Sequence, residues 1–267
     1  MGTLDGKVAI VSGSGRGIGR EVALKLASEG ASVVINDLDK GPAEETVADI
    51  VASGGKAVAC VGSVTEDEFA ERFVNTAVDS FGGLDIIVNN AGYTWDTVIQ
   101  KMTDEQWDAI LDVHLKAPFR ILRAAQPYIK ANPTDHHRKV VNVSSVSGQY
   151  GNAGQANYSS AKAGVIGFTK TMAKEWGRYK VNVNAVAYGW ILTRMTEATA
   201  EDDATLDIGG RTIKVGINPQ IAAAAAATIP LGRPGTPEEA AGAIYLLCTQ
   251  ESNYVSGQCL TVDAGQR

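Results

Sequence analysis

Short apolar runs alternate with helical stretches along almost the whole chain. The first run is Val8–Val11, and the later ones are Ser32–Asn36, Ala57–Val61, Ile86–Asn89, Val140–Val143, Val183–Val186 and Cys259–Val262. Runs that are apolar at nearly every position are typical of parallel strands buried on both faces of a sheet. Strand–helix alternation requires crossover connections, which are right-handed. The sequence therefore predicts an α/β fold: a Rossmann-type, doubly wound parallel sheet of about seven strands with helices on both faces.

Start signals precede several of the helical stretches. Thr65-x-x-Glu68 and Thr103-x-x-Gln106 match the capping box, in which two orphan N–H groups are satisfied reciprocally. Thr236 is followed by proline, which favours the first position of a helix. There is no linker, internal repeat or composition boundary, so residues 1–267 are predicted to form one domain.

Charge and hydropathy exclude several classes of function. The net charge of the 267-residue chain is −6, which disfavours binding to nucleic acid or to an anionic membrane surface. No apolar run approaches the roughly 18 residues of a membrane span. Residues Met1–Lys7 lack the basic and apolar regions of a signal peptide, so we expect a cytoplasmic protein.

Cysteine and histidine residues give no sign of a metal site. Cys60, Cys248 and Cys259 lack paired-ligand spacing and are expected to be reduced and mostly buried. His136 and His137 are adjacent in a polar loop, where solvated side chains are more usual than metal ligands. No metal is predicted.

One long excursion, Thr196–Pro230, separates the sixth predicted strand from the seventh. It starts with an acidic, loop-like part and continues into Ile221 followed by six alanines, a run that favours helix. A long excursion at this point is often a lid over a site. The alternative is surface elaboration without a role in function.

A glycine-rich turn, within Ser12–Gly19, follows the first predicted strand and opens a helix. Gly13, Gly17 and Gly19, with Ile18 between the last two, permit a tight turn. Backbone N–H groups can then approach a pyrophosphate at the helix N-terminus. A tight strand–helix connection without a ligand is the alternative.

Asp37 ends the second predicted strand, eighteen positions after Gly19. A carboxylate there would hydrogen-bond the hydroxyls of an adenosine ribose and would repel a 2′-phosphate, which favours NAD. Arg16 is the counter-argument, because it could pair with that phosphate. NAD is therefore the predicted cofactor, and NADP is the open alternative.

The tetrapeptide Asn89-Asn90-Ala91-Gly92 ends the fourth predicted strand, where ligands bind in open α/β sheets. Asn90, with Ala91 and Gly92, would support either the cofactor or the central sheet. A simple turn is the other interpretation.

Tyr158 and Lys162 lie four positions apart, on one face of a helix. An ammonium beside a phenol favours the phenolate and lowers its pKa from about 10 toward working pH. The phenol then becomes a usable acid and base. A chance pair on a helix face is the alternative.

These motifs, in this order and spacing, resemble the short-chain dehydrogenase/reductase family over essentially the whole chain. The resemblance rests on the glycine turn, Asn89–Gly92, Ser144-Ser145 and Tyr158-x-x-x-Lys162. Within the family the chain is most similar to the 3-oxoacyl-(acyl-carrier-protein) reductases, through Gly151–Tyr158 and Tyr254–Gln258. The resemblance implies hydride transfer with a nicotinamide cofactor, and a homotetramer.

The resemblance also implies a role for each catalytic residue. Tyr158 would be the general acid in reduction and the base in oxidation, and Lys162 would lower its pKa and hold the nicotinamide ribose. Ser145, thirteen positions before Tyr158, would hydrogen-bond the substrate oxygen, with Ser144 as the neighbouring candidate. Two hydroxyl donors with a cation behind them would stabilise the charge that hydride transfer builds on oxygen.

His114 departs from the family pattern, in which Asn at this position anchors a bend whose main-chain carbonyl holds a water beside the lysine. Pro118, four residues on, cannot donate to the carbonyl of His114. We therefore expect the proton relay to survive the substitution. The alternatives are an imidazole that titrates near neutrality and a histidine that only packs in place of the asparagine.

Two further departures affect the cofactor site that the resemblance implies. Tyr188-Gly189 stands where Pro-Gly is usual, before Thr193. The Tyr188 ring could stack on the nicotinamide or the substrate, or simply pack. Ser63-Val64 stands where Asp-Val usually contacts the adenine, and the serine can still form a hydrogen bond.

The predicted function is an NAD(P)-dependent oxidoreductase that interconverts a secondary alcohol and a ketone. The leading substrate is a 3-oxoacyl thioester, and the alternatives are a steroid, a polyol or another small alcohol. Gln149, Ile191 and Met195 are the candidate substrate contacts. A nucleotide-sensing regulator without catalysis is the alternative of another class, which the intact serine, tyrosine and lysine disfavour.

Overall fold

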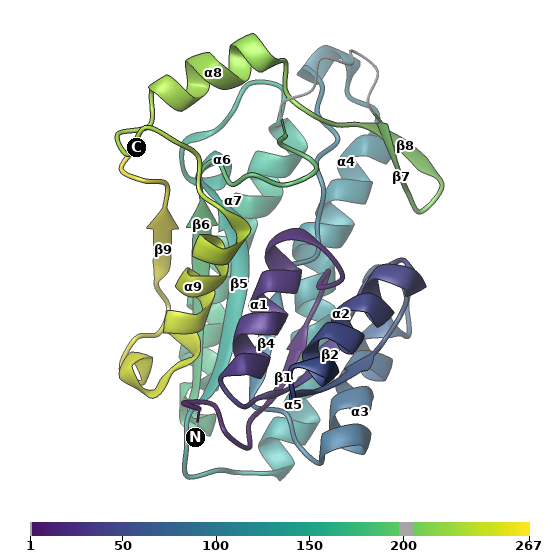
Figure 1. The fold of residues 1–267 in the computed structure, drawn as a ribbon, viewed down its shortest axis with the longest axis vertical. Coiled ribbons are helices and arrows are strands. Elements are labelled where there is room, and N and C mark those ends of the chain that lie inside the picture. The colour runs from purple at the N-terminus through teal and green to yellow at the C-terminus, as the bar shows by residue number, and fades with distance from the viewer. Residues whose placement is uncertain (1, 198–204) are drawn as a thin grey trace.

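The computed structural model describes residues 2–197 and 205–267. Its main element is a parallel sheet of seven strands in the order β3-β2-β1-β4-β5-β6-β9. In Figure 1 the strands point upward, so that their carboxyl ends share the upper edge of the sheet. The strands are β1 (Val8–Val11), β2 (Ser32–Ile35), β3 (Lys56–Ala59), β4 (Ile86–Asn89), β5 (Arg138–Ser145), β6 (Val181–Tyr188) and β9 (Cys259–Val262). The predicted Rossmann-type α/β fold is confirmed.

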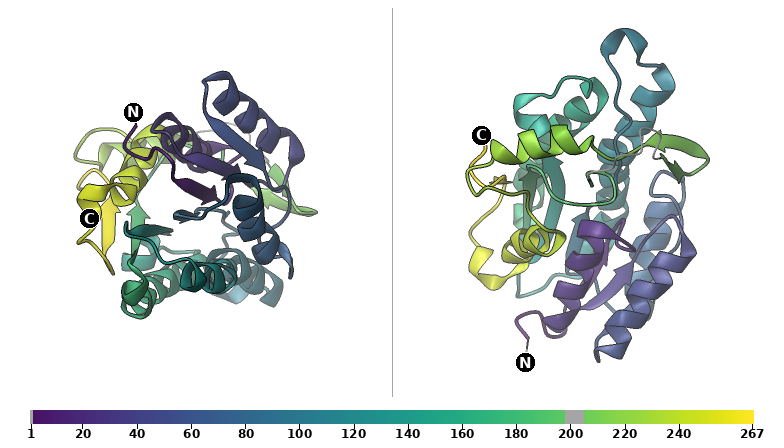
Figure 2. Two further views of the ribbon diagram at one scale, coloured as in Figure 1. Left: turned by 90° about the horizontal axis from the view of Figure 1, so that it is seen from below. Right: turned by 45° about the horizontal axis from the view of Figure 1, so that its top comes forward.

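Helices connect these strands and cover both faces of the sheet (Figure 2). One face is covered by α1 (Gly17–Ser28), α2 (Lys40–Ala52) and α9 (Pro237–Cys248), and the other by α3 (Phe69–Phe81), α5 (Ala117–Ala131) and α7 (Ala156–Trp176). The shorter helices are α4 (Asp104–Leu111), α6 (Val146–Tyr150) and α8 (Pro219–Ala227), and the single turns are η1 (Ile99–Lys101), η2 (Asp112–Lys116), η3 (Gly177–Tyr179) and η4 (Gln250–Ser252).

Successive residues of a central strand enter opposite halves of the core. In β1, Ala9 and Val11 pack toward α1 and α9, whereas Val8 and Ile10 pack toward α3 and α5. Because side chains alternate across a strand, burial of both faces requires an apolar residue at every position. Because the strands are parallel, the polar residues that follow them lie together at the carboxyl edge of the sheet.

The helix starts were predicted with mixed success. The capping boxes at Thr103 and Thr236 are confirmed. The one at Thr65 is wrong, since α3 begins only at Phe69. The Thr65 hydroxyl instead bonds the hydroxyl of Ser63 at 2.8 Å. The Thr65 hydroxyl that would have capped the helix is therefore used in a local turn between polar side chains.

The excursion between β6 and β9 lies over the carboxyl edge of the sheet (Figure 1). Its alanine run forms α8, as predicted. Part of the predicted acidic loop is instead an antiparallel hairpin, β7 (Thr205–Ile208) and β8 (Arg211–Lys214). The hairpin turns at Gly209-Gly210, with φ of 61° and 81°, conformations that glycine adopts readily. The rest of the acidic part, 198–204, lies outside the described residues.

Candidate active site

The glycine turn joins β1 to α1 and lies against the end of β4. Gly13 and Gly17 have positive φ, 62° and 56°, which only glycine tolerates without strain. A Cβ at Gly13 would lie 2.8 Å from the Cα of Ala91. The side-chain amide of Asn90 donates to the carbonyls of Ser12 and Gly13, at 3.0 Å each. Asn90 therefore supports the glycine turn, and its predicted part in holding the cofactor stays a prediction.

The N-terminus of α1 has no side-chain cap. Its N-cap residue, Arg16, makes no capping hydrogen bond, and the first turn holds no acidic residue. The N–H groups of that turn, which contains Gly17, Ile18 and Gly19, have no partner within the helix and lie at the positive end of its dipole. These features suit an anionic group such as a pyrophosphate. The residues present thus fit the predicted dinucleotide.

Asn36 belongs to this site although sequence reasoning missed it. It directly follows β2 and is 1% exposed. Its side chain accepts from the N–H of Gly13 at 3.1 Å and donates to the carbonyls of Cys60 and Gly62, at 3.0 and 2.9 Å. It links the glycine turn to the ends of β2 and β3. A polar residue at the end of an apolar strand, beside Asp37, was the available signal.

Asp37 lies next to the glycine turn, as predicted. Its side chain is 13% exposed, and its Oδ2 would lie 2.5 Å from a Cβ at Gly15. Ser63 and Val64 follow β3 at the same edge of the sheet, and Val64 is buried in the core. The carboxylate that is predicted to bind the ribose is therefore adjacent to the glycine turn.

Ser145, Tyr158 and Lys162 come together where β5 ends beside α7. The ammonium of Lys162 donates to the carbonyl of Val143 at 2.6 Å and lies 5.6 Å from the centre of the Tyr158 ring. Ser144 is engaged elsewhere, because its hydroxyl donates to the Lys162 carbonyl at 2.9 Å. Of the two serines, it is therefore Ser145 whose hydroxyl acts on Tyr158.

Burial changes the pKa of both ionisable groups. It raises the pKa of Tyr158 to about 12, an effect that the hydrogen bond from Ser145 partly opposes and the charge of Asp96 increases. It lowers the pKa of Lys162 to about 7. The net shift of the Tyr158 pKa is thus opposite to the lowering that was predicted from Lys162. The ammonium is directed at the Val143 carbonyl rather than at the phenol oxygen.

His114 is 3% exposed and lies in the π-helical turn η2, a feature that recurs at functional sites. Its Nε2 is 2.7 Å from the carbonyl of Tyr93. Because a carbonyl only accepts, Nε2 carries the proton. Nδ1 is buried and has no hydrogen-bond partner among residues 2–197 and 205–267. Burial, and then the charge of Lys162, lowers the pKa of His114 well below 6.5. The alternative of an imidazole that titrates near neutrality is therefore wrong.

Gly92 packs directly against the imidazole of His114. A Cβ at Gly92 would lie 2.6 Å from Nδ1. The same ring meets Tyr158 edge to face. Tyr93, which fixes the proton on Nε2, is a second residue that sequence reasoning missed, since a main-chain acceptor leaves no sequence signal.

The Tyr188 ring packs in the core. It is 4% exposed, and its hydroxyl donates to the carbonyl of Ala240 in α9 at 2.6 Å. Of the two interpretations of this ring, simple packing is confirmed, and stacking on the nicotinamide or the substrate is wrong. The Tyr188 carbonyl does lie 3.4 Å from the hydroxyl of Ser145, and the N–H of Gly189 donates to the carbonyl of Val262 at 2.9 Å. It is the backbone of this turn that borders the site.

The segment after β6 closes on the glycine turn. The methyl carbon of Thr193 lies 3.9 Å from where a Cβ of Gly17 would be. The Thr193 N–H donates to the hydroxyl of Thr196 at 2.9 Å, which fixes a tight turn. Thr193 thus lies beside Gly17, in the turn that is predicted to hold the pyrophosphate.

The three candidate substrate contacts have different environments. Ile191 is 7% exposed and packs against Gly235, so the core takes most of its side chain. The amide of Gln149 donates to the hydroxyl of Thr261 in β9 at 3.0 Å. Met195 lies directly before the excursion and is half-buried.

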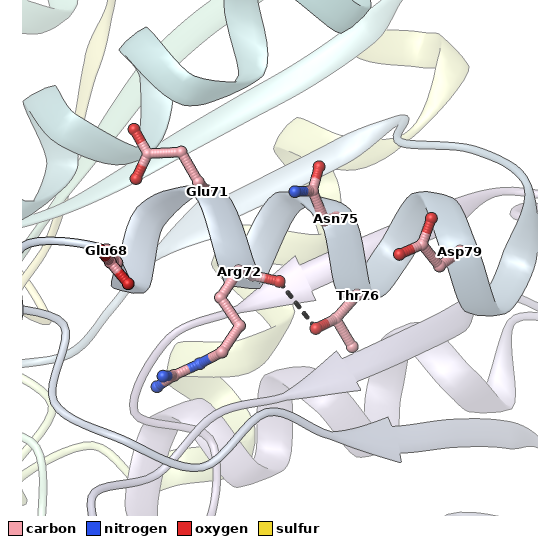
Figure 3. A pocket seen from close by; sticks show the side chains of 6 residues that line it. All are labelled: Glu68, Glu71, Arg72, Asn75, Thr76 and Asp79. Atoms are coloured by element: carbon pink, nitrogen blue, oxygen red, sulfur yellow. Dashed lines mark hydrogen bonds between the residues drawn. The ribbon is translucent and has the colours of Figure 1, made fainter.

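A hollow of about 560 Å³ on the outer surface of α3 is separate from these residues. Figure 3 shows that its side chains lie along a single helix, with Glu71 and Arg72 pointing in different directions. The Thr76 hydroxyl donates to the Arg72 carbonyl at 2.7 Å. The lining residues are Glu68, Glu71, Arg72, Asn75, Thr76 and Asp79. Because these side chains do not point toward one another, the hollow gives no evidence of a binding site.

Within the described ranges, no three or more His, Cys, Asp or Glu side chains are grouped to hold a metal ion. His136 pairs with Asp85, Nε2 to Oδ1 at 2.6 Å. Cys60 and Cys248 are buried, Cys259 is half-buried, and all three are free thiols. No helix in the part of the chain that the structure describes has the length and apolar character needed to cross a bilayer.

A dinucleotide-binding sheet edge beside a Ser–Tyr–Lys group defines an oxidoreductase that acts on a CH–OH group. Residues 13–267 match a family model described as enoyl-(acyl carrier protein) reductase. The 3-oxoacyl-[acyl-carrier-protein] reductase of Synechocystis is 40% identical over 99% of this chain and 98% of its own length. The Thermotoga maritima enzyme of that name is 39% identical over 98% of each chain, and the Escherichia coli one is 36% identical over 98% of this chain and 97% of its own. The chain belongs to the short-chain dehydrogenase/reductase family.

Proposed function

We propose that this protein is an NAD(P)-dependent reductase that interconverts a 3-oxoacyl thioester and the corresponding 3-hydroxyacyl thioester. One observation carries the reaction type: Ser145, Tyr158 and Lys162 meet at the carboxyl end of β5, on the same sheet edge as the uncapped N-terminus of α1. The substrate class is supported by the relatives that are named 3-oxoacyl-[acyl-carrier-protein] reductases.

The bound nicotinamide would supply the hydride that adds to the substrate carbonyl carbon. Ser145 would hold the carbonyl oxygen by a hydrogen bond. Tyr158 is protonated at neutral pH, because its pKa is raised to about 12, and would donate its proton to that oxygen as negative charge develops there. Lys162 would return a proton to the phenolate. In oxidation each proton would move in the opposite direction.

His114 would position Tyr158 rather than exchange protons. The ring is neutral and its proton is held on Nε2 by the Tyr93 carbonyl. Pro118 lies in the first turn of α5 and has no N–H for the His114 carbonyl. That carbonyl is proposed to accept a hydrogen bond from the water that completes the relay beside Lys162. The proton relay would therefore be retained. The imidazole would replace the usual asparagine only as a packing residue.

Asp37 supports NAD as the cofactor, since its carboxylate lies beside the glycine turn at the position of a ribose-binding acid. The excursion Thr196–Pro230 would act as a lid over the substrate. Its hairpin is docked on α4, where Arg211 pairs with Glu105, Nε to Oε1 at 3.2 Å. Burial raises the pKa of Tyr93, and the charge and hydrogen bond of Arg211 oppose part of that rise. One cation of the excursion thus interacts with both Glu105 and Tyr93.

Asp96 favours a small hydroxylated compound as the second substrate class. Its carboxylate accepts from the amide of Gln155 at 2.7 Å and is close enough to raise the pKa of Tyr158. A carboxylate beside the reacting oxygen could bind a further hydroxyl of a polyol. The proposal also includes a cytoplasmic location, as expected in the sequence analysis, and a homotetramer, which the family resemblance implies.

A substrate panel tests this function. We would assay a 3-oxoacyl thioester, a steroid ketone and a polyol, each with NAD(H) and NADP(H). The wild type is expected to turn over the thioester fastest, and Tyr158→Phe is expected to lower kcat by at least about 100-fold while binding the cofactor normally. Unchanged turnover by Tyr158→Phe would refute the mechanism, and faster turnover of the polyol would refute the substrate class.

A further inference from the structure

Three charged side chains meet where β2 leads into α2. Arg16 comes from the glycine turn, and Asp37 and Asp39 follow β2. Nη1 of Arg16 lies 2.8 Å from Oδ2 of Asp39 but 3.8 Å from Oδ1 of Asp37. The closer partner of the arginine is therefore the aspartate that the dinucleotide motif does not include.

Asp39 stands at the start of α2 but does not cap that helix with its side chain. It is the N-cap residue, and its carboxylate makes no capping hydrogen bond, although aspartate is among the best capping residues. The Asp39 side chain therefore does not cap α2. It forms an ion pair with Arg16 of the glycine turn instead.

Asp37 is oriented by the same segment. Its Oδ1 accepts the N–H of Asp39 at 3.0 Å, while its Oδ2 lies against Gly15. One carboxylate oxygen is thereby held by the backbone and the other is left beside the turn where the cofactor would bind. Asp37 thus remains placed to bind the ribose hydroxyls, whereas Asp39 forms the ion pair with Arg16.

Arg194 adds a second cation to this group from the segment after β6. Burial lowers the pKa of Arg194 first, the charge of Arg16 lowers it further, and Asp37, Asp39 and Glu197 oppose that change. The other four charges thus lie within electrostatic reach of Arg194. The carboxylates outnumber the arginines by one, so the group as a whole repels a dianionic phosphate more than it repels a neutral hydroxyl.

We propose that Asp39 is a specificity-determining residue for the cofactor, because it holds Arg16 in an ion pair and so withholds that guanidinium from a 2′-phosphate. The proposal rests on the proposed nicotinamide-dependent function. An arginine released from this pair could bind a phosphate through two parallel hydrogen bonds. The pair is partly exposed, with Asp39 57% and Arg16 36% accessible, and such pairs are weak. The expected effect is accordingly a moderate change in preference rather than a reversal.

The test compares the affinities of the intact protein for NADH and NADPH, measured by cofactor fluorescence without substrate. Asp39→Asn keeps the shape of the side chain and removes its charge. We expect it to tighten NADPH binding about fivefold and to change NADH binding less than twofold. Asp49→Asn is the matched control, because Asp49 forms a similar ion pair with Arg20, at 2.7 Å and 46% exposed. The control is expected to change neither affinity.

The double variant Arg16→Met/Asp39→Asn shows whether the effect acts through the arginine. We expect it to lose the gain in NADPH affinity. An unchanged ratio of the two affinities in Asp39→Asn, or a gain that persists without Arg16, would overturn the inference while leaving the proposed function intact. A wild type that binds neither cofactor would overturn both.

Discussion

The imidazole of His114 and the phenol of Tyr158 meet edge to face, with ring centres 5.1 Å apart and ring planes at 89°. The contact joins η2 to α7, so the proposed catalytic tyrosine is supported by a turn from a separate part of the chain. Edge-to-face aromatic pairs contribute about 0.5–1.5 kcal/mol beyond their buried area. The support is uncharged, because the imidazole is neutral.

We expect His114→Asn to leave the shape of the pH–rate profile unchanged between pH 6 and 9. The neutral imidazole does not titrate in that range, so its removal deletes no ionisation. The rate itself should fall a few fold as the ring contact is lost. His114→Gln is the control, since its amide can still donate to the Tyr93 carbonyl. A wild-type inflection that disappears in His114→Asn would contradict the prediction.

The two directions of the reaction should respond oppositely to pH. Oxidation needs the phenolate of Tyr158, whose pKa is about 12, so its rate should rise from pH 7 to 10 as the phenolate fraction grows. Reduction needs the phenol, which persists throughout, but Lys162 loses its proton above its pKa of about 7. Reduction should therefore decline over the same range. Initial rates in both directions, at constant ionic strength, would check this. An oxidation rate that falls with pH would disprove it.

Gly92→Ala should damage both stability and turnover. The added methyl group would lie 2.6 Å from Nδ1 of the buried His114, and overpacking of this kind costs about 1–3 kcal/mol. Denaturant unfolding and kcat would be measured together. Gly41→Ala is the control, because no atom lies within 4 Å of its Cβ position. The double variant Gly92→Ala/His114→Ala should recover part of the stability. If it does not, the clash is not with the imidazole.

Arg211→Met should raise KM more than it lowers kcat. The variant removes the ion pair with Glu105 that docks the hairpin on α4 and leaves the catalytic side chains in place. An exposed pair is worth about 0.2–1 kcal/mol, so KM should rise about two- to fivefold. Glu105→Gln should do the same, and the two changes combined should add little. Fully additive effects would show that the residues do not act as a pair.

The layers of the fold were predictable because each strand of the parallel sheet is marked by an apolar run in the sequence. The residues of β1 face both halves of the core, so all four must be apolar. Four consecutive apolar residues can be recognised in the sequence. The hairpin β7–β8 was missed because strands flanked by polar residues lack such a run. Its Gly209-Gly210 turn was the remaining clue.

The functional site was predictable where spacing along one element determines proximity. Tyr158 and Lys162 share a helix face whatever surrounds them. The proton on Nε2 of His114 was not predictable, because a main-chain carbonyl of Tyr93, from a different segment, determines it. Tyr188 shows the same limit, since its ring could face the site or the core until α9 supplied an acceptor at Ala240.

The sequence alone determined the strand–helix alternation, the glycine turn and the spacing of the serine, tyrosine and lysine, because periodicity and backbone constraints act over a few residues. The tertiary structure decided which of two aspartates pairs with Arg16, and it decided the directions in which the pKa values of Tyr158 and Lys162 shift. Those outcomes depend on distances and burial, which arise only when distant segments pack together.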